Sequence, residues 1–168
     1  EFDILCDIDR FCRENGIRYF LCGGTLLGAI RHKGFIPWDD DVDIGMLRPD
    51  YERFLETYKS DHNELWWHGN KSGYFSPFAK VSDKRTVLTG GDFPDMGCGV
   101  YVDITPFDEI PDDPKEWKKA ARRWRWTWNL LTLRNIRLFR KGRSFLNQLI
   151  VFAFRPLRFI PNRWRSEE

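Results

Sequence analysis

Four aspartates lie within five positions of this sequence, in the stretch "WDDDVDIGM". Neighbouring carboxylates repel one another, so the cluster is costly unless protons are shared or a cation lies among the acids. The alternation of charged and apolar residues in "DVDIGML" is typical of a strand with one face on a core. In such a strand Asp41 and Asp43 share one face, and the apolar residues beside them share the other. The spacing therefore predicts two carboxylates side by side, with Asp39 and Asp40 orienting the loop.

A ligand set made only of carboxylate oxygens favours a hard divalent ion, Mg²⁺ or Mn²⁺, over zinc. Magnesium commonly takes one or two protein carboxylates and completes its shell with water and substrate phosphate. Asp103 offers a third oxygen donor, because it is the single carboxylate in the apolar run "VYVDITPF". We therefore predict that Asp41, Asp43 and Asp103 hold a metal ion and are catalytic. The competing interpretation is a solvated acidic loop that caps a helix.

The residues just upstream of the acidic cluster could hold phosphate. The short apolar run "IRYFLC" reads as a buried strand, and a turn follows it that consists of Gly23, Gly24 and Thr25. Consecutive glycines let backbone N–H groups approach a phosphate closely, and a helix with Thr25 as its N-cap would add its positive end. Three cations suited to phosphate follow one helix length farther on: Arg31, His32 and Lys33. A phosphate turn followed by paired strand aspartates is equipment for phosphoryl transfer.

The elements that must position these residues can be read from apolar spacing. A first helix is predicted from about Asp3 to Asn15, and a second from Pro49 to about Lys59. A hairpin is expected around Ser82–Lys84, and residues 100–107 read as another strand. This order of elements predicts an α/β (α+β) fold, with a small mixed β-sheet flanked by helices and a basic helical segment at the C-terminal end.

The composition suits a globular protein. The 168 residues are 42% apolar and 31% charged, which is enough for a sizeable core and argues against disorder. No apolar run approaches the roughly 20 residues that a membrane span needs. The N-terminus lacks the basic start and apolar core of a signal peptide. The four cysteines form no CxxC pair and have no histidine at zinc-ligand spacing.

Charge divides the chain into two parts. Residues 1–114 carry 12 Lys and Arg against 22 acids, whereas residues 115–165 carry 15 Lys and Arg and one acid. We therefore predict a catalytic domain over residues 1–112 and a basic, aromatic helical extension over residues 113–168.

Three interpretations of the basic extension compete. Lys and Arg interleaved with Trp suit an anionic membrane surface, where the cations meet headgroups and the rings enter the interface. The same helix could instead pack its Trp and Leu residues on the sheet. Nucleic acid binding is the least favoured interpretation, because no nucleic-acid motif accompanies the arginines, and we expect no nucleic acid partner.

The stretch "YFLCGGTLLGAIRHKGFIPWDDDVDIGMLRPDYERF" (residues 19–54) resembles the signature of the LicD family. That family includes bacterial phosphocholine transferases and the eukaryotic fukutin and fukutin-related proteins. The blocks "AKVSD" and "VYVDITPFD" are similar to the next two family blocks, so the resemblance covers about residues 2–110. The closing block of the family, an aromatic-rich motif that ends near Tyr-Gly-Asp, has no clear counterpart here.

The resemblance implies a nucleotidyltransferase-like fold, since the family is placed in the superfamily of DNA polymerase beta. It implies Gly23, Gly24 and Thr25 as the phosphate turn, with Asp41 and Asp43 as metal ligands. Asp103 becomes the third carboxylate, which ligates the metal or takes the proton of the attacking hydroxyl. Lys80 stands in the second block, where a phosphate contact and an ordinary surface lysine are equal alternatives.

The implied chemistry is transfer of a phospho-alcohol, such as phosphocholine, from a CDP-activated donor to a hydroxyl of a glycan or lipid-linked saccharide, with release of CMP. Two rivals stay open. One is a nucleotidyltransferase that releases pyrophosphate, and the other is a non-catalytic membrane-surface module. The expected location is cytoplasmic, with peripheral attachment to the inner face of the membrane through the basic extension.

Overall fold

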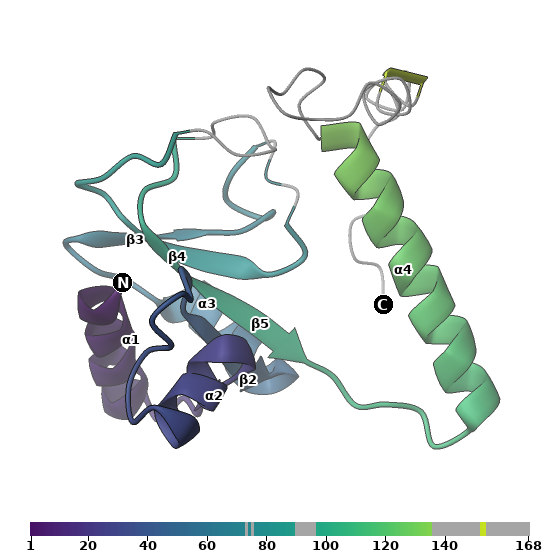
Figure 1. The fold of residues 1–168 in the computed structure, drawn as a ribbon, viewed down its shortest axis with the longest axis horizontal. Helices are drawn as coiled ribbons and strands as arrows, with labels where there is room; N and C mark the ends of the chain where they lie inside the picture. Colours follow the sequence, from purple (N-terminus) through teal and green to yellow (C-terminus); the bar gives the residue numbers. More distant parts are fainter. Residues whose placement is uncertain (73, 75, 90–96, 136–151, 154–168) are drawn as a thin grey trace. The chain divides into compact units, whose positions relative to one another are not determined.

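The computed structural model describes residues 1–72, 74, 76–89, 97–135 and 152–153. These residues belong to two compact units: Glu1–Thr89 with Met96–Glu109, and Gly90–Asp95 with Ile110–Glu168. Among the described residues, the first unit holds a β-sheet and three helices, and the second holds the long helix α4 (Figure 1). The boundary expected after residue 112 stays a prediction.

The first unit is built on a mixed sheet of five strands in the order β1-β2-β5-β4-β3. β2 and β5 pair in parallel, and the three other neighbouring pairs are antiparallel. The strands are β1 (Phe20–Leu21), β2 (Asp43–Leu47), β3 (Asn63–Trp66), β4 (Ala79–Asp83) and β5 (Tyr101–Phe107). This sheet with its flanking helices confirms the predicted α/β fold class.

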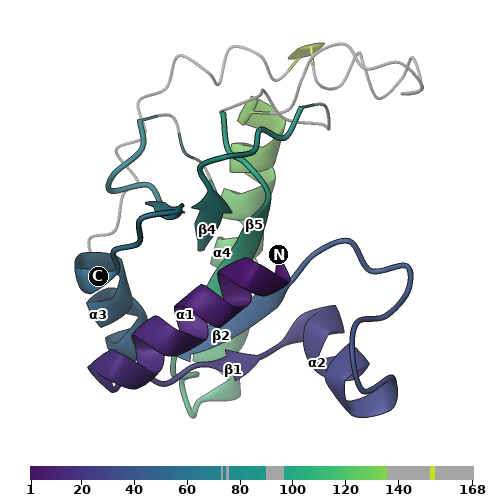
Figure 2. The ribbon, with the colours of Figure 1, turned by 90° about the vertical axis from the view of Figure 1, so that its left-hand side faces the viewer.

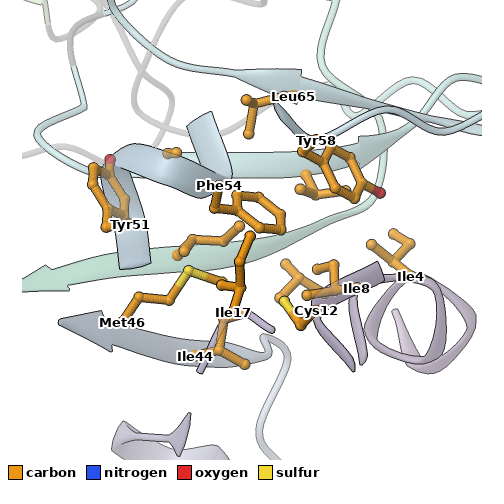
Figure 3. Close-up of a cluster of buried hydrophobic side chains, with 14 of the residues drawn as sticks. Ile4, Ile8, Cys12, Ile17, Ile44, Met46, Tyr51, Phe54, Tyr58 and Leu65 are labelled. Atoms are coloured by element: carbon orange, nitrogen blue, oxygen red, sulfur yellow. The ribbon is translucent and has the colours of Figure 1, made fainter. Parts of the chain in front are cut away.

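Helices α1 (Phe2–Asn15) and α3 (Arg48–Thr57) pack on one face of this sheet. Figure 3 shows Ile8 and Cys12 of α1 beside Phe54 of α3, with Ile44 of β2 below them. All four side chains are buried, because each helix turns its apolar stripe toward the alternate, inward-facing residues of the strands. The opposite face of β2 and β5 is thereby left for polar residues.

A carboxylate at the end of this core ties three elements together. Asp7 of α1 accepts hydrogen bonds from the Tyr58 hydroxyl and from the Asn63 amide, each at 2.8 Å. Tyr58 follows α3 and Asn63 begins β3. The network fixes α1 against both elements.

The path from β1 to β2 differs in detail from the prediction. Helix α2 runs over Gly23–Arg31, so it begins directly at the glycine pair and its N-cap is Cys22. The prediction of Thr25 as N-cap was wrong: the Thr25 hydroxyl oxygen accepts a hydrogen bond of 2.9 Å from the backbone N–H of Asp43. Figure 2 shows α1 lying across the strands and α2 apart from it, next to β1.

The predicted hairpin around Ser82–Lys84 was also wrong. β4 pairs instead with β3 on one side and with β5 on the other. Residues 86–89, the described part of the expected return strand after the turn, are irregular. β3 takes the edge position by pairing with β4, and its segment "NELW" places Leu65 on the core face, although so short a segment gives little signal in the sequence.

The second unit contains α4 (Pro114–Asn135), which confirms the predicted basic helix. Its 22 residues carry seven Lys and Arg and one acid, Glu116. None of the helices in the described ranges is both long enough and apolar enough to cross a membrane. The later apolar segment "SFLNQLIVFAFRPLRFI" lies almost wholly outside the described residues.

Candidate active site

Three polar side chains form a row across the middle of the sheet. Asp43 of β2 lies directly opposite Asp103 of β5, and Asp103 lies directly opposite Lys80 of β4. Directly paired residues of neighbouring strands project from the same face of a sheet. Since Ile44 and Ile104 are fully buried in the core on the other face, the row projects away from α1 and α3. We call Asp43, Asp103 and Lys80 the polar row.

Asp41 precedes the first residue of β2, yet it follows the same alternation. Val42 between the two aspartates is fully buried, and its carbonyl oxygen accepts a hydrogen bond of 2.9 Å from the backbone N–H of Asp103. The ladder between β2 and β5 therefore continues past Asp43. Asp41 and Asp43 are both half-buried, as expected for residues on the polar face.

The Lys80 ammonium and the Asp103 carboxylate form a close ion pair. Nζ of Lys80 donates a hydrogen bond of 2.5 Å to Oδ1 of Asp103, and the two side chains are only 14% and 11% exposed. The same Nζ lies 3.4 Å from the centre of the Tyr101 ring. Tyr101 stands two residues before Asp103 on β5 and shares its face. The lysine is thus held by a carboxylate and by an aromatic ring.

The glycine pair lies against the carboxylates. Gly23 adopts a left-handed conformation with φ of +56°, and a Cβ at this position would come within 2.8 Å of Oδ2 of Asp43. A Cβ at Gly24 would overlap the carboxylate of Asp39. The backbone N–H of Cys22 donates a hydrogen bond of 3.2 Å to the carbonyl oxygen of Asp43. The left-handed conformation favours glycine at position 23, and the turn presents the N-terminus of α2 to the polar row.

The acidic groups raise one another's proton affinity. Burial raises the pKa of Asp103 to about 6, with Asp43 and Asp41 adding to the rise and Lys80 opposing it. The pKa values of Asp41 and Asp43 are also raised, first by burial and then by the neighbouring aspartates. Lys80 opposes the rise at both groups. The site therefore holds a surplus of negative charge that favours binding of a cation.

The predicted phosphate residues fall into two groups in space. Gly23, Gly24, Thr25 and Lys80 lie beside the carboxylates, as the contacts above show. The other three, Arg31, His32 and Lys33, lie at the far end of α2, roughly 12 Å along the helix from the turn. They make local contacts: Arg31 donates a hydrogen bond to Nδ1 of His32, and the His32 ring meets the Trp38 ring edge to face.

The donors of the site fit Mg²⁺ or Mn²⁺. Asp43 and Asp103 offer carboxylate oxygens on one face, and Asp41 adds charge close by. Within the described part of the chain, no three acidic, histidine or cysteine side chains are close enough to form a complete metal cluster. A two-carboxylate site completed by water and phosphate is the ordinary arrangement for magnesium.

Two contributions to the site were missed in the sequence. Tyr101 could have been found from strand alternation, because it precedes Asp103 by two residues. The contact of Asp39 with Gly24 could not, because it depends on the path of the loop between α2 and β2.

The fold and the site together define an α/β domain in which a glycine turn at a helix N-terminus faces paired strand carboxylates. The chain belongs to the family described as "LicD/FKTN/FKRP, nucleotidyltransferase domain", whose family model matches residues 16–136. This match includes the sheet from β1 onward, the polar row and α4.

Known relatives agree with this assignment. The chain is 39% identical over 120 residues to the lipopolysaccharide cholinephosphotransferase LicD of Haemophilus influenzae, which covers 67% of this chain and 43% of that protein. It is 60% identical over 35 residues to the human ribitol 5-phosphate transferase FKRP, covering 21% of this chain and 7% of that protein. The matched part thus spans less than half the length of either relative.

Proposed function

We propose that this chain carries the catalytic site of a transferase that moves a phospho-alcohol, such as phosphocholine, from a CDP-activated donor to a hydroxyl of a glycan or lipid-linked saccharide. The observation that carries the proposal is the polar row beside the glycine turn. It places two carboxylates, a lysine and a helix N-terminus at one point of the sheet. The relatives named for cholinephosphate and ribitol 5-phosphate transfer support this class of reaction.

The residues of the site divide the work between them. The backbone N–H groups of Gly23 and Gly24 at the start of α2 hold a phosphate of the donor, because helix N-termini attract anions. Lys80 adds a positive charge to the same phosphate. Asp41 and Asp43 hold Mg²⁺ or Mn²⁺, which when bound supplies charge neutralisation for the diphosphate.

Asp103 is either a further ligand or the base for the acceptor. As base, it takes the proton of the attacking hydroxyl. The hydroxyl oxygen forms a bond to the phosphorus that bears the alcohol, and the bond from that phosphorus to the bridging oxygen of the diphosphate breaks. The bridging oxygen keeps the electron pair and leaves as part of CMP. Thr25 supports the geometry, because its hydroxyl holds the backbone of Asp43.

The leaving product tests the reaction. The 168-residue chain is incubated with Mn²⁺, an oligosaccharide or lipid-linked acceptor and each of CDP-choline, CDP-ribitol, CTP and ATP. We expect CMP from a CDP-alcohol. Pyrophosphate released from CTP or ATP without CMP from any CDP-alcohol would overturn the choice in favour of a nucleotidyltransferase. Turnover of none of the four, with intact fold and lipid binding, would favour the non-catalytic module.

We also propose that α4 attaches the protein peripherally to an anionic membrane surface on the cytoplasmic side. Trp117, Trp124 and Trp128 recur at intervals of seven and four residues and so share one stripe of the helix. The rings of Trp124 and Trp128 stack with centroids 6.3 Å apart. Seven Lys and Arg against one acid suit anionic headgroups, and the indole rings suit the interface.

A further inference from the structure

Lys80 is the end member of the polar row and the cation paired with Asp103. Lys80 of β4 pairs directly with Asp103 of β5, and Asp103 pairs directly with Asp43 of β2. The ammonium lowers the proton affinity of Asp41, Asp43 and Asp103, so its charge reaches all three carboxylates. The Lys80 side chain is only 14% exposed, so it is a largely buried partner of Asp103 rather than a surface lysine.

The ion pair and a metal ion compete for the same carboxylate. Oδ1 of Asp103 already accepts a hydrogen bond of 2.5 Å from Nζ of Lys80. A divalent ion bound to this carboxylate would lie within a few Å of the Lys80 ammonium, and at such a distance the repulsion between the two cations is strong. The ammonium must therefore leave Asp103 before that carboxylate can serve as a full ligand.

Aromatic rings beside the ammonium offer it a second interaction partner. Nζ of Lys80 already lies 3.4 Å from the centre of the Tyr101 ring, and the Phe78 ring is 5.4 Å away. An ammonium over an aromatic face keeps a favourable interaction without a carboxylate. The lysine stem has freely rotating bonds, so a small swing suffices.

We propose that Lys80 is a built-in counter-ion of the acidic site, which holds Asp103 in the metal-free protein and gives it up when a divalent ion binds. The inference rests on the proposed function only in requiring that the site take a divalent ion. It makes Lys80 a positioning residue whose charge becomes available to the donor phosphate once the ion is in place.

Metal affinity without nucleotide is the direct test. Mn²⁺ is titrated into the full chain while the signal of free Mn²⁺ is followed by electron paramagnetic resonance. Because a charge-assisted ion pair no longer opposes the ion, Lys80→Met should bind Mn²⁺ about tenfold more tightly than wild type. An equal or weaker affinity in Lys80→Met would overturn the inference.

Lys71 provides a matched control. Its ammonium lies 2.8 Å from Oε2 of Glu64 and 4.2 Å from the centre of the Trp66 ring, so it has the same two kinds of contact, with Glu64 of β3 as its carboxylate partner in place of an acid of the polar row. Lys71→Met should leave the Mn²⁺ affinity unchanged. A gain equal to that of Lys80→Met would mean that the effect is general charge removal and would contradict the inference.

Thermal unfolding gives a readout independent of affinity. In chelator, Lys80→Met should unfold at a lower temperature than wild type, because three carboxylates lose their cation. Saturating Mn²⁺ should remove most of that difference, whereas it should leave any deficit of Lys71→Met in place. A deficit of Lys80→Met that persists in Mn²⁺ would count against the inference.

Lys80→Arg covers the case in which Lys80→Met does not fold. A guanidinium can hold the Asp103 carboxylate with two hydrogen bonds, so Mn²⁺ affinity should fall several-fold below wild type. Unchanged affinity in this variant would overturn the inference. If wild type itself binds no Mn²⁺, the metal part of the proposed function fails and the inference fails with it. If wild type binds Mn²⁺ and neither Lys80→Met nor Lys80→Arg changes the affinity, the inference is contradicted while the proposed function is not.

Discussion

At the scale of single residues, Gly23 is the position where a left-handed backbone lies against a carboxylate of the polar row. Its φ of +56° strains any other residue, and a Cβ would meet the carboxylate of Asp43. We expect Gly23→Ala to lower the free energy of unfolding by roughly 1–2 kcal/mol and to weaken Mn²⁺ binding. Urea unfolding and Mn²⁺ titration measure the two effects.

Gly16→Ala is a control that introduces the same backbone strain without contact with the site. The φ of Gly16 is +62°, but an added Cβ would have nothing within 4 Å. Gly16→Ala should therefore lower stability by a similar amount and leave Mn²⁺ binding intact. Equal loss of Mn²⁺ binding in both variants would contradict the role given to Gly23.

Single residues also show how far the sequence can be read. Asp41 and Asp43 could be placed on one face of a strand, because strand alternation is a local property, whereas the position of Asp103 opposite Asp43 depends on the pairing of β2 with β5. The partner of Lys80 could not, since it depends on β4 pairing with β5 in one particular register. Thr25 was misjudged for the same reason: its hydroxyl is used by the backbone of Asp43, which lies 18 residues away in the chain.

At the scale of elements, Asp7 decides how α1 holds α3 and β3. Burial raises the pKa of Asp7, but hydrogen bonds from Ser60, Asn63 and Tyr58 outweigh it and keep the pKa below its usual 3.8. A carboxyl group whose pKa is lower in the folded than in the unfolded protein stabilises the fold at any pH above its unfolded-state pKa. This stability is lost as the pH falls through the folded-state pKa. Asp7→Asn should therefore cost about 2 kcal/mol at pH 7, and the difference should shrink only below about pH 4.

Urea unfolding at pH 7, 5 and 3 checks this expectation. Asp3→Asn, an exposed acid on the same helix, should change stability by no more than about 0.5 kcal/mol at pH 7. A difference between wild type and Asp7→Asn that disappears already at pH 5 would contradict the assigned direction of the shift.

A second prediction at this scale concerns the binding of α4 to anionic membranes. Two of its cations, Lys118 and Lys119, lie beside the first turn of the helix. Each contributes about 1 kcal/mol near an anionic bilayer, so replacing both by Ala should weaken binding to phosphatidylglycerol vesicles roughly tenfold or more. Vesicle co-sedimentation measures this, with phosphatidylcholine vesicles as the comparison. Equal binding to both lipids would rule against an electrostatic attachment.

Elements with regular patterns were predicted well, and β3 was not predicted. The apolar spacing of α1 and the basic run of α4 are repeated over several turns, so each gives a strong signal. β3 has four residues, and its place at the sheet edge is decided by its pairing with β4 rather than by its own sequence. The prediction of a hairpin was wrong because β4 pairs with two strands, β3 and β5, that are distant in the sequence.

At the scale of the whole molecule, family membership and geometry support one account. The family match extends over residues 16–136 and so includes both the polar row and α4. In the proposed function, the two carboxylates and the glycine turn bind a diphosphate and an ion together, because each neutralises part of the other's charge. Nucleotide binding should therefore depend on the metal.

Calorimetric titration of CDP-choline into the full chain, in Mn²⁺ and in chelator, tests that claim most directly. Wild type should bind in Mn²⁺ and lose most of its affinity in chelator, and Asp43→Asn should bind roughly a hundredfold more weakly than wild type in Mn²⁺. Asp40→Asn, which changes an exposed neighbour, should bind as wild type does. Equal binding by wild type and Asp43→Asn, or equal binding with and without Mn²⁺, would contradict the account.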